Sequence, residues 1–347
     1  MPTRITVSAP ERLGEVRRFL QDVFQSGDTP NFRPELLGWK YFGRHPWWAG
    51  VRSYVLESGD AIAAHGCVTP VRFDGPSGLI ESVQVIDWAA SRAVPGGGLL
   101  IYRHCLSLVE TLLAIGGSDD TRRLMPTVKW FRRMPDLELY ARPLHPFRAH
   151  FQIGKLGPRA MAKTARRLLW SLHPALPPAS DWRCTPVKEL ERVWPPPPGF
   201  VRIHRTPEWL NHFLDCPTVR FTALRLDHVG AAGGGAPRGH ALLAHAHRQL
   251  RIVDFGVDSA DEAEWVRAVS SITGWARSVP GVSEIVAGSS LPLFQRIYAA
   301  AGMRPRVSLI VYLADPHKRI PLDAEVEINL LIGDTGYSID PHNPLLC

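Results

Sequence analysis

The sequence predicts a mixed α/β protein made of two similar domains, and three observations lead to this prediction. Strand-like and helical patterns alternate through most of the chain. At 347 residues the chain is too long for one typical core, while each half can bury a core of its own. The order of the elements then recurs after a proline-rich stretch, which indicates two copies of one unit.

In the first half, a helix precedes several strands. Residues 11–24 carry apolar side chains at helical spacing, which predicts an amphipathic helix. Short apolar segments bounded by Gly-Asp or Asp-Gly-Pro turn signals predict strands at 53–56, 61–68 and 81–88. A long apolar helix is expected at 99–114, and residues 112–115 begin another strand.

A change in composition near residue 150 marks the division between the domains. Basic residues at 155–167 predict a basic helix, and four consecutive prolines follow at 195–198. Four prolines cannot continue a helix or a central strand, so this stretch predicts a semi-rigid connector. We expect an N-terminal domain at 1–150, the basic helix and connector at 151–199, a second domain at 200–315 and a C-terminal tail at 316–347.

The second domain repeats landmarks of the first. Phe42 and Phe213 each stand four residues before a proline, and an aspartate, Asp87 or Asp258, follows that proline by 41 residues. A helical pattern (99–114 and 262–277) and then a short apolar strand (112–115 and 283–287) come next in both halves.

Several classes of protein are disfavoured by composition. The five cysteines are widely spaced and lack a C-x-x-C pair, which argues against a disulfide framework and a zinc ribbon. His240, His245 and His247 offer too few ligands for a metal site, and we expect no metal. There is no membrane-length apolar run or signal peptide, so a cytoplasmic location is expected. The formal charge of +7 favours anionic ligands only weakly.

Two motifs resemble the GNAT acyltransferase superfamily. In that family a strand of the form D-x-A-V-x-P precedes x-x-R-G-x-G and a helix. Residues 87–98, D-W-A-A-S-R-A-V-P-G-G-G, align without a gap, although Arg92 replaces the family's proline and Pro95 its arginine. The closing family pattern appears as Tyr298-Ala-Ala-Ala-Gly302-Met303. The whole chain, over about residues 10–145 and 200–313, resembles a tandem GNAT protein.

The resemblance implies two GNAT-like domains, each a mixed, mostly antiparallel sheet flanked by helices, with an acyl-CoA as co-substrate. Acyl-CoA carries a pyrophosphate, which several backbone N–H groups at a glycine-rich turn and a helix N-terminus can bind. The expected cofactor-binding residues are Ala89, Ala90, Val94, Gly96, Gly97, Gly98 and Leu99. A tight connection without a ligand is the alternative interpretation of these glycines.

Two residues are candidates for catalysis, each with a structural alternative. Asp87 is the carboxylate nearest the glycine turn and is expected as general base; it could instead accept backbone hydrogen bonds. Tyr298 matches the family's acid, which protonates the departing thiolate, but a tyrosine at a helix end can also simply pack. Asp334, in the tail, is expected to form an Asx turn or to face the acceptor.

Neither half contains all of these parts. The first half has the glycines, but Trp130 and Phe131 occupy the region where its tyrosine would be expected. The second half has Tyr298, but four carboxylates in its turn, at residues 258–264, would repel a pyrophosphate. We therefore expect the acyl-CoA site in the first half.

The leading function is acyl transfer, expected to be acetyl transfer, to an amine or hydroxyl of a small molecule. One alternative is a degenerate protein that binds acyl-CoA or acts as an interaction module. Another is an aminoacyl-tRNA-dependent transferase of the peptidoglycan-bridge type, in which the basic stretch 155–167 would contact RNA phosphates. Apart from this alternative, nucleic acid is not expected as a partner. The sequence leaves the acceptor, the acyl chain length and the oligomeric state open.

Overall fold

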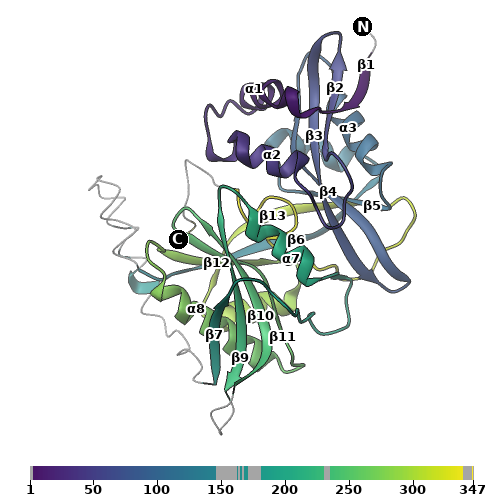
Figure 1. Ribbon diagram of the computed structural model, residues 1–347. Coiled ribbons are helices and arrows are strands. Elements are labelled where there is room, and N and C mark those ends of the chain that lie inside the picture. Colours follow the sequence, from purple (N-terminus) through teal and green to yellow (C-terminus); the bar gives the residue numbers. More distant parts are fainter. Residues whose placement is uncertain are drawn as a thin grey trace.

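The computed structural model describes residues 3–145, 162, 165, 168–170, 181–229, 235–338 and 346. Within these residues thirteen strands belong to one continuous sheet (Figure 1). The strands are β1 (Thr3–Val7), β2 (Ser53–Ser58), β3 (Ala61–Gly75), β4 (Gly78–Ala90), β5 (Thr111–Ile115), β6 (Phe131–Pro143), β7 (Trp182–Val187), β8 (Arg202–Ile203), β9 (Arg220–Val229), β10 (Gly235–Ala246), β11 (Gln249–Val257), β12 (Glu284–Ser289) and β13 (Arg304–Ala314). The helices are α1 (Leu13–Phe24), α2 (Pro34–Phe42), α3 (Gly97–Leu106), α4 (Asp119–Leu124), α7 (Pro207–His212), α8 (Glu262–Ser278) and α9 (Pro292–Ala300).

The predicted internal repeat is confirmed element by element. In residues 3–145, the first half, the order β2-β3-β4-α3-β5-α4-β6 is matched by β9-β10-β11-α8-β12-α9-β13 in residues 181–338, the second half. Most neighbouring strands pair antiparallel, whereas β4 with β5 and β11 with β12 pair parallel. The mixed α/β class and the mostly antiparallel sheets are therefore confirmed.

The two halves exchange their last strands. The sheet order is β1-β2-β3-β4-β5-β13-β6-β12-β11-β10-β9-β7. Strand β13 of the second half lies between β5 and β6, and β6 of the first half lies between β13 and β12. Figure 1 shows β13 and β6 crossing the middle of the molecule between the two halves. Each half thus completes its sheet with a strand from the other.

The predicted connector contains part of the second half. Strand β7 falls inside the 151–199 stretch and pairs with β9 along its whole length. The prolines at 195–198 form no regular structure, and Trp194, just before them, is buried. The predicted basic helix at 155–167 lies outside the described residues except for positions 162 and 165.

Helices cover the sheet on both faces. In the first half, α1 and α2 pack on one face through Val16, Leu20 and Leu37, and α3 packs on the other face through Ile101 and Tyr102. In the second half, α8 and α9 bury apolar residues against β9 to β12. A further core joins the two halves and includes the tail residues Ile328, Leu330, Leu331 and Ile332. No helix among the described residues is long and apolar enough to cross a membrane.

The apolar stretch expected as one helix at 99–114 is instead a shorter helix followed by a turn and a strand. Helix α3 ends at Leu106, where the Ser107 hydroxyl donates to the His104 carbonyl oxygen at 2.6 Å. Turns over 107–110 then bring Thr111 opposite Ser82, so that β5 can pair with β4. Pairing with β4 requires the chain to leave the helix, a tertiary constraint that apolar periodicity does not contain.

Candidate functional site

Two parallel strand pairs separate at corresponding places in the two halves. Strands β4 and β5 pair from Ser82↔Thr111 to Gln84↔Leu113 and then diverge. Strands β11 and β12 pair from Gln249↔Glu284 to Ile252↔Ala287 and then diverge. Strand β4 leads into α3, and β11 leads into α8. Beyond the last pair at each opening, the two strands no longer pair with each other, which leaves backbone groups there for other partners.

The glycine triplet lies at the start of α3, as predicted. A different structural feature accounts for the glycine at each of the three positions. Gly96 is the N-cap and has φ +80°, a left-handed conformation that glycine adopts without strain. A Cβ on Gly97 would lie 3.1 Å from the Leu56 side chain, and one on Gly98 would lie 2.7 Å from the Trp88 ring. The Trp88 indole donates to the Gly98 carbonyl oxygen at 2.9 Å. Packing therefore accounts for the glycines at 97 and 98.

The N-terminus of α3 keeps unsatisfied backbone donors. No side chain caps it. The Gly97 amide donates to the Val94 carbonyl and the Leu100 amide to the Gly96 carbonyl, whereas the amides of Gly98 and Leu99 have no partner in the described chain. Unpaired amides at a helix N-terminus, together with the helix dipole, attract an anion.

The other residues expected to bind a cofactor are arranged around this turn. Ala89 is buried and packs with the α1–α2 side of the sheet, while Ala90 and Val94 pack with the α3 side. Leu99 is half-buried at the first turn of α3. The expected residues therefore gather at one turn, although Ala89 faces away from α3.

A row of aromatic rings runs from the glycine turn along the α3 face. Ring centroids are 4.6 Å apart for Trp88 and Tyr102, 5.6 Å for Tyr102 and Phe131, and 4.5 Å for Phe131 and Trp130. Trp88, Phe131 and Trp130 are only half-buried. Trp130 and Phe131, which stand where a tyrosine was expected, thus continue a partly exposed row of rings that begins at Trp88, the residue bonded to Gly98.

The corresponding turn of the second half is closed to an anion. The Asp261 side chain caps α8 by accepting from the Ala263 amide at 2.9 Å. The Trp265 indole donates to the Ser259 carbonyl oxygen at 2.9 Å. A carboxylate already occupies the positive end of this helix, so a phosphate there would meet like charge.

Asp87 is held in an unusual backbone conformation at a bulge in β4. Pairing with β3 shifts between Cys67↔Ile86 and His65↔Ala89, and Asp87 has φ +49°. A non-glycine residue in this region costs about 1–3 kcal/mol and persists only where its surroundings enforce it. Such strain is enriched at functional sites.

Three side chains hold Asp87. The Lys40 ammonium lies 2.5 Å from Asp87 Oδ2, the Tyr41 hydroxyl donates to the same oxygen at 2.8 Å, and His65 Nδ1 lies 2.9 Å from the Asp87 carbonyl oxygen. Burial favours a neutral amine, but the charges of Asp87 and Asp334 outweigh it and hold the pKa of Lys40 above its usual value. Burial, and then Asp87, raise the pKa of Tyr41. The carboxylate is therefore paired with a buried cation.

The C-terminal tail reaches this cluster. A Cβ on Gly333 would lie 2.3 Å from the Gln84 amide oxygen of β4, so Gly333 packs directly on the strand that carries Asp87. The Asp334 carbonyl accepts from the amides of Tyr337 and Ser338, and Tyr337 packs edge-on against Trp39 at 5.7 Å. Burial raises the pKa of Asp334 despite the nearby Lys40. The tail thus covers the first-half cluster.

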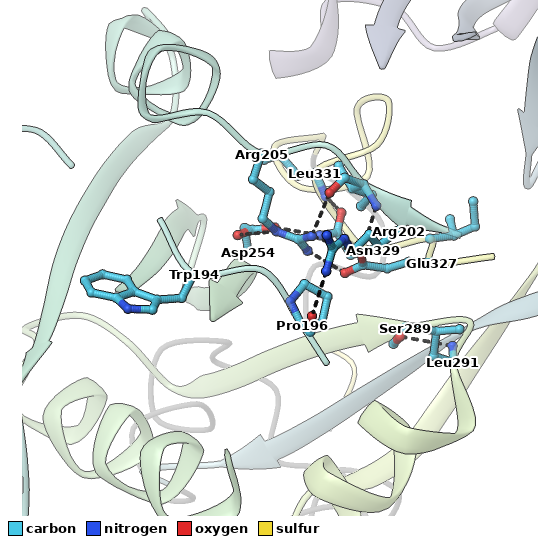
Figure 2. A network of polar contacts seen from close by, with 12 residues as sticks. Trp194, Pro196, Arg202, Arg205, Asp254, Ser289, Leu291, Glu327, Asn329 and Leu331 are labelled. Atoms are coloured by element: carbon cyan, nitrogen blue, oxygen red, sulfur yellow. Dashed lines mark hydrogen bonds and ion pairs between the residues drawn. The ribbon is translucent and has the colours of Figure 1, made fainter. Parts of the chain in front are cut away.

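Tyr298 lies in the second half, where it lines a pocket together with Arg205 and Asp254. Figure 2 shows the polar network that contains these two residues. Arg205 pairs with Asp254 at 2.9 Å and with Glu327, and Asn329 donates to Asp254 at 3.0 Å. Tyr298 and Asp254 line a small cavity of about 10 Å³. Burial, followed by the charges of Glu327 and Asp254, raises the pKa of Tyr298. The structure therefore does not bring Asp87 and Tyr298 into one site.

The second-half counterpart of Asp87 is Asp254, not the Asp258 that sequence spacing selected. Asp87 and Asp254 each stand three residues before the end of β4 or β11, whereas Asp258 follows β11. Each aspartate pairs with a buried cation, Lys40 for Asp87 and Arg205 for Asp254. Each also lies near a buried histidine on the neighbouring strand, His65 or His240, and His240 Nε2 lies 2.9 Å from Asp254 Oδ1. Sequence reasoning missed Lys40, His65, Arg205 and Asp254, and it considered His240 only as a metal ligand. Distance from the strand end would have been the better signal for Asp254.

The histidines considered for a metal have separate roles. His240 bonds to Asp254, whereas His245 contacts Arg220 and Thr222. Glu81 pairs with Arg72 at the other end of β4.

The architecture resembles that of several solved structures. A GCN5-related N-acetyltransferase from Anabaena variabilis matches with a TM-score of 0.57 and 12% identity, over 93% of this chain and 75% of that one. N-myristoyltransferase from Saccharomyces cerevisiae, with bound myristoyl-CoA, matches with a TM-score of 0.57 and 11% identity, over 91% and 80%. A tandem GNAT protein from the clavulanic acid biosynthesis pathway matches with a TM-score of 0.52 and 14% identity, over 93% and 100%.

The chain has a tandem GNAT fold. The predicted resemblance to this superfamily is thus confirmed at the level of the fold. No protein-family model matches the sequence, and no curated protein matches it either. At such low identity the likeness of the GNAT folds establishes architecture, while the chemistry must be argued from the residues of this chain.

Proposed function

We propose that the protein is an acyl-CoA-dependent acyltransferase that binds its donor at the N-terminus of α3, in the first half. The observation that carries this proposal is the pair of free amides at Gly98 and Leu99, beside the opening between β4 and β5. The equivalent position in the second half is capped by Asp261. A pyrophosphate fits the first turn and would be repelled at the second.

The aromatic row supports the same assignment. Once the phosphates are bound, the pantetheine arm and acyl group need an apolar surface next to them, and Trp88, Phe131 and Trp130 offer one. The yeast N-myristoyltransferase with the same fold holds myristoyl-CoA. We propose acetyl as the transferred group, to an amine or hydroxyl of a small molecule.

In the proposed reaction, the acceptor attacks the thioester carbonyl and Asp87 accepts its proton. Backbone N–H groups at the opening would stabilise the negative charge that develops on the carbonyl oxygen. Tyr298 was expected to protonate the thiolate, but it lies beside Asp254 in the second half. We therefore propose no role for Tyr298 at a donor site in the first half.

Calorimetric titration with acetyl-CoA tests the proposal. Glutamate at Gly98 would collide with Trp88, so the exposed residue Ala93 in the same turn is a better place for a charge. We expect Ala93→Glu to weaken binding about tenfold by repelling the pyrophosphate, and Ala93→Gln to stay within about twofold of wild type. Equal affinities of Ala93→Glu and wild type would place the donor elsewhere.

A non-catalytic acyl-CoA-binding module is the second candidate. It is favoured by the pairing of Asp87 with Lys40 and Tyr41, which leaves this carboxylate no free role in the unliganded protein. Measuring thiol release from acetyl-CoA over a panel of amines separates the two functions. Burial raises the pKa of the Cys105 and Cys184 thiols to about 12, so these two will contribute little background. Binding without turnover for every amine would favour the module.

A further inference from the structure

A small cavity lies between the first half and α7, next to the Asp87 cluster. Its volume is about 20 Å³, room for a single water-sized group. The lining includes Trp39, Lys40, His45, Arg52, His212 and Tyr337. Residues of α2, the loop after it, α7 and the tail therefore meet around one polar space.

Two buried donors at this cavity lack a partner. His45 Nδ1 accepts from the Trp47 amide at 3.2 Å, so a neutral His45 ring carries its proton on Nε2. Neither His45 Nε2 nor the Trp39 indole Nε1 has a hydrogen-bond partner in the described chain. His45 is only 6% exposed. Buried donors of this kind are costly unless something accepts from them, which indicates that an acceptor atom belongs in the cavity.

The surroundings favour an anionic acceptor atom. Burial, then His212, Arg52 and Arg72, lower the pKa of His45 to about 2, and burial and Arg52 lower the pKa of His212 to about 4. Both rings are thus neutral at pH 7, and the charged side chains that act on them are cations. Arg52 is fixed by donating to the carbonyl oxygens of Trp39, Lys40 and Gly43 at 2.7–2.8 Å.

A larger, more open groove shares the lining residue His45 with this cavity. Its volume is about 640 Å³, and its lining includes the loop at 42–51, Arg72 of β3 and Glu208 of α7. His45 lines both the groove and the cavity, and Lys40 lines the cavity while pairing with Asp87. A molecule in the groove would therefore meet the cavity at His45, and the Lys40 side chain on the cavity wall contacts Asp87.

We propose that the acyl acceptor enters through this groove and is a small amine or alcohol bearing a carboxylate, one oxygen of which accepts from Trp39 and His45. The inference rests on the proposed function, because it takes Asp87 as the proton acceptor. For an amine, the new C–N bond forms as the C–S bond breaks, the amine proton passes to Asp87, and the thiolate leaves with the electron pair and is protonated by solvent. The inner cavity selects the carboxylate.

Formate serves as a probe of the cavity without any need for turnover. In a formate titration followed by ¹H–¹⁵N spectra, we expect the Trp39 indole signal, assigned with Trp39→Phe, to shift and saturate. The Trp209 indole is also buried without a partner but does not line the cavity, so its signal should not move. His45→Leu should raise the dissociation constant about tenfold, and His45→Gln, which keeps a donor, should retain most of the binding.

Two results would overturn the cavity's role. One is the absence of a saturable shift of the Trp39 signal in wild type. The other is a shift of the Trp39 signal with methylammonium that equals the shift with formate. This comparison uses the wild-type protein, so it is valid even if His45→Leu fails to fold.

Matched acceptors test the rest of the inference. With acetyl-CoA as donor, we expect KM at least about tenfold lower for β-alanine than for ethylamine, and His45→Leu should remove this ratio with little change in kcat. Equal KM values for the two amines would contradict this inference while leaving acyl transfer intact. Failure of acetyl-CoA to bind would instead contradict the proposed function, and the formate titration would still decide the cavity.

Discussion

At the scale of single residues, several unusual features of the molecule occur together at Asp87. Its left-handed backbone, its ion pair with Lys40 and its bond to Tyr41 all occur at one bulge. The sequence located Asp87 at the end of a strand near the glycines. It could not predict Lys40 as the partner, because α2 and β4 are far apart in the chain and only tertiary packing brings them together.

Removing the Lys40 charge should destabilise the protein strongly. Lys40→Met leaves Asp87 as a buried carboxylate without its cation, which typically costs about 3–5 kcal/mol. The double variant Lys40→Met with Asp87→Asn removes both charges and should recover most of this loss. Urea unfolding measures both, and a loss below about 1 kcal/mol for Lys40→Met would show that the pair is unimportant.

Buried histidines should make the protein sensitive to mild acid. Burial lowers the folded-state pKa of His212 to about 4, while the unfolded chain binds a proton near 6.5. Since the unfolded state then holds more protons, stability is lost as pH falls below 6.5 and continues to fall toward pH 4. The free energy of unfolding should drop between pH 7 and pH 5 by about 1.5 kcal/mol more in wild type than in His212→Phe. Equal drops would mean that His212 titrates normally in the folded protein.

At the scale of elements, the turn before α3 shows what sequence reasoning could and could not supply. The glycine pattern correctly located a turn from strand to helix. It did not reveal that Gly98 is required by the Trp88 ring, because that contact depends on the bulge at Asp87 and on how α3 lies on the sheet. Likewise, periodicity predicted α3 but not its end at Leu106.

An alanine scan of two helical glycines tests this packing. Gly98→Ala places a Cβ 2.7 Å from the Trp88 ring and should destabilise the protein by about 1–3 kcal/mol. Gly14, in α1, has nothing within 4 Å of an added Cβ, so Gly14→Ala should be neutral or stabilising by up to about 1 kcal/mol. Denaturant unfolding compares the two variants, and similar effects at both positions would exclude close packing at Gly98.

At the scale of the whole molecule, the exchange of β6 and β13 binds the halves together. The repeat in the sequence predicted two units, and the fold confirms the repeat. The exchange was not predictable, because β6 and β13 carry similar apolar patterns and alternation does not identify a strand's partner. The division at residues 150 and 199 remains a prediction about the chain, while in space the sheet is continuous.

Neither half should fold alone. Residues 1–150 lack β13, which leaves β5 and β6 without the strand that joins them, and exposed strand edges promote aggregation. We expect residues 1–150 expressed alone to show no cooperative unfolding, and co-expression with residues 151–347 to give a soluble complex. A sharp unfolding transition for either half by itself would contradict this account of the sheet.

The central claim is that the donor binds at the first-half turn, and hydrogen exchange with and without acetyl-CoA tests it most directly. The account predicts slower exchange of the amides at residues 96–100 in the complex, with no change at residues 258–265, where Asp261 already caps α8. Protection at 258–265 without protection at 96–100 would contradict it.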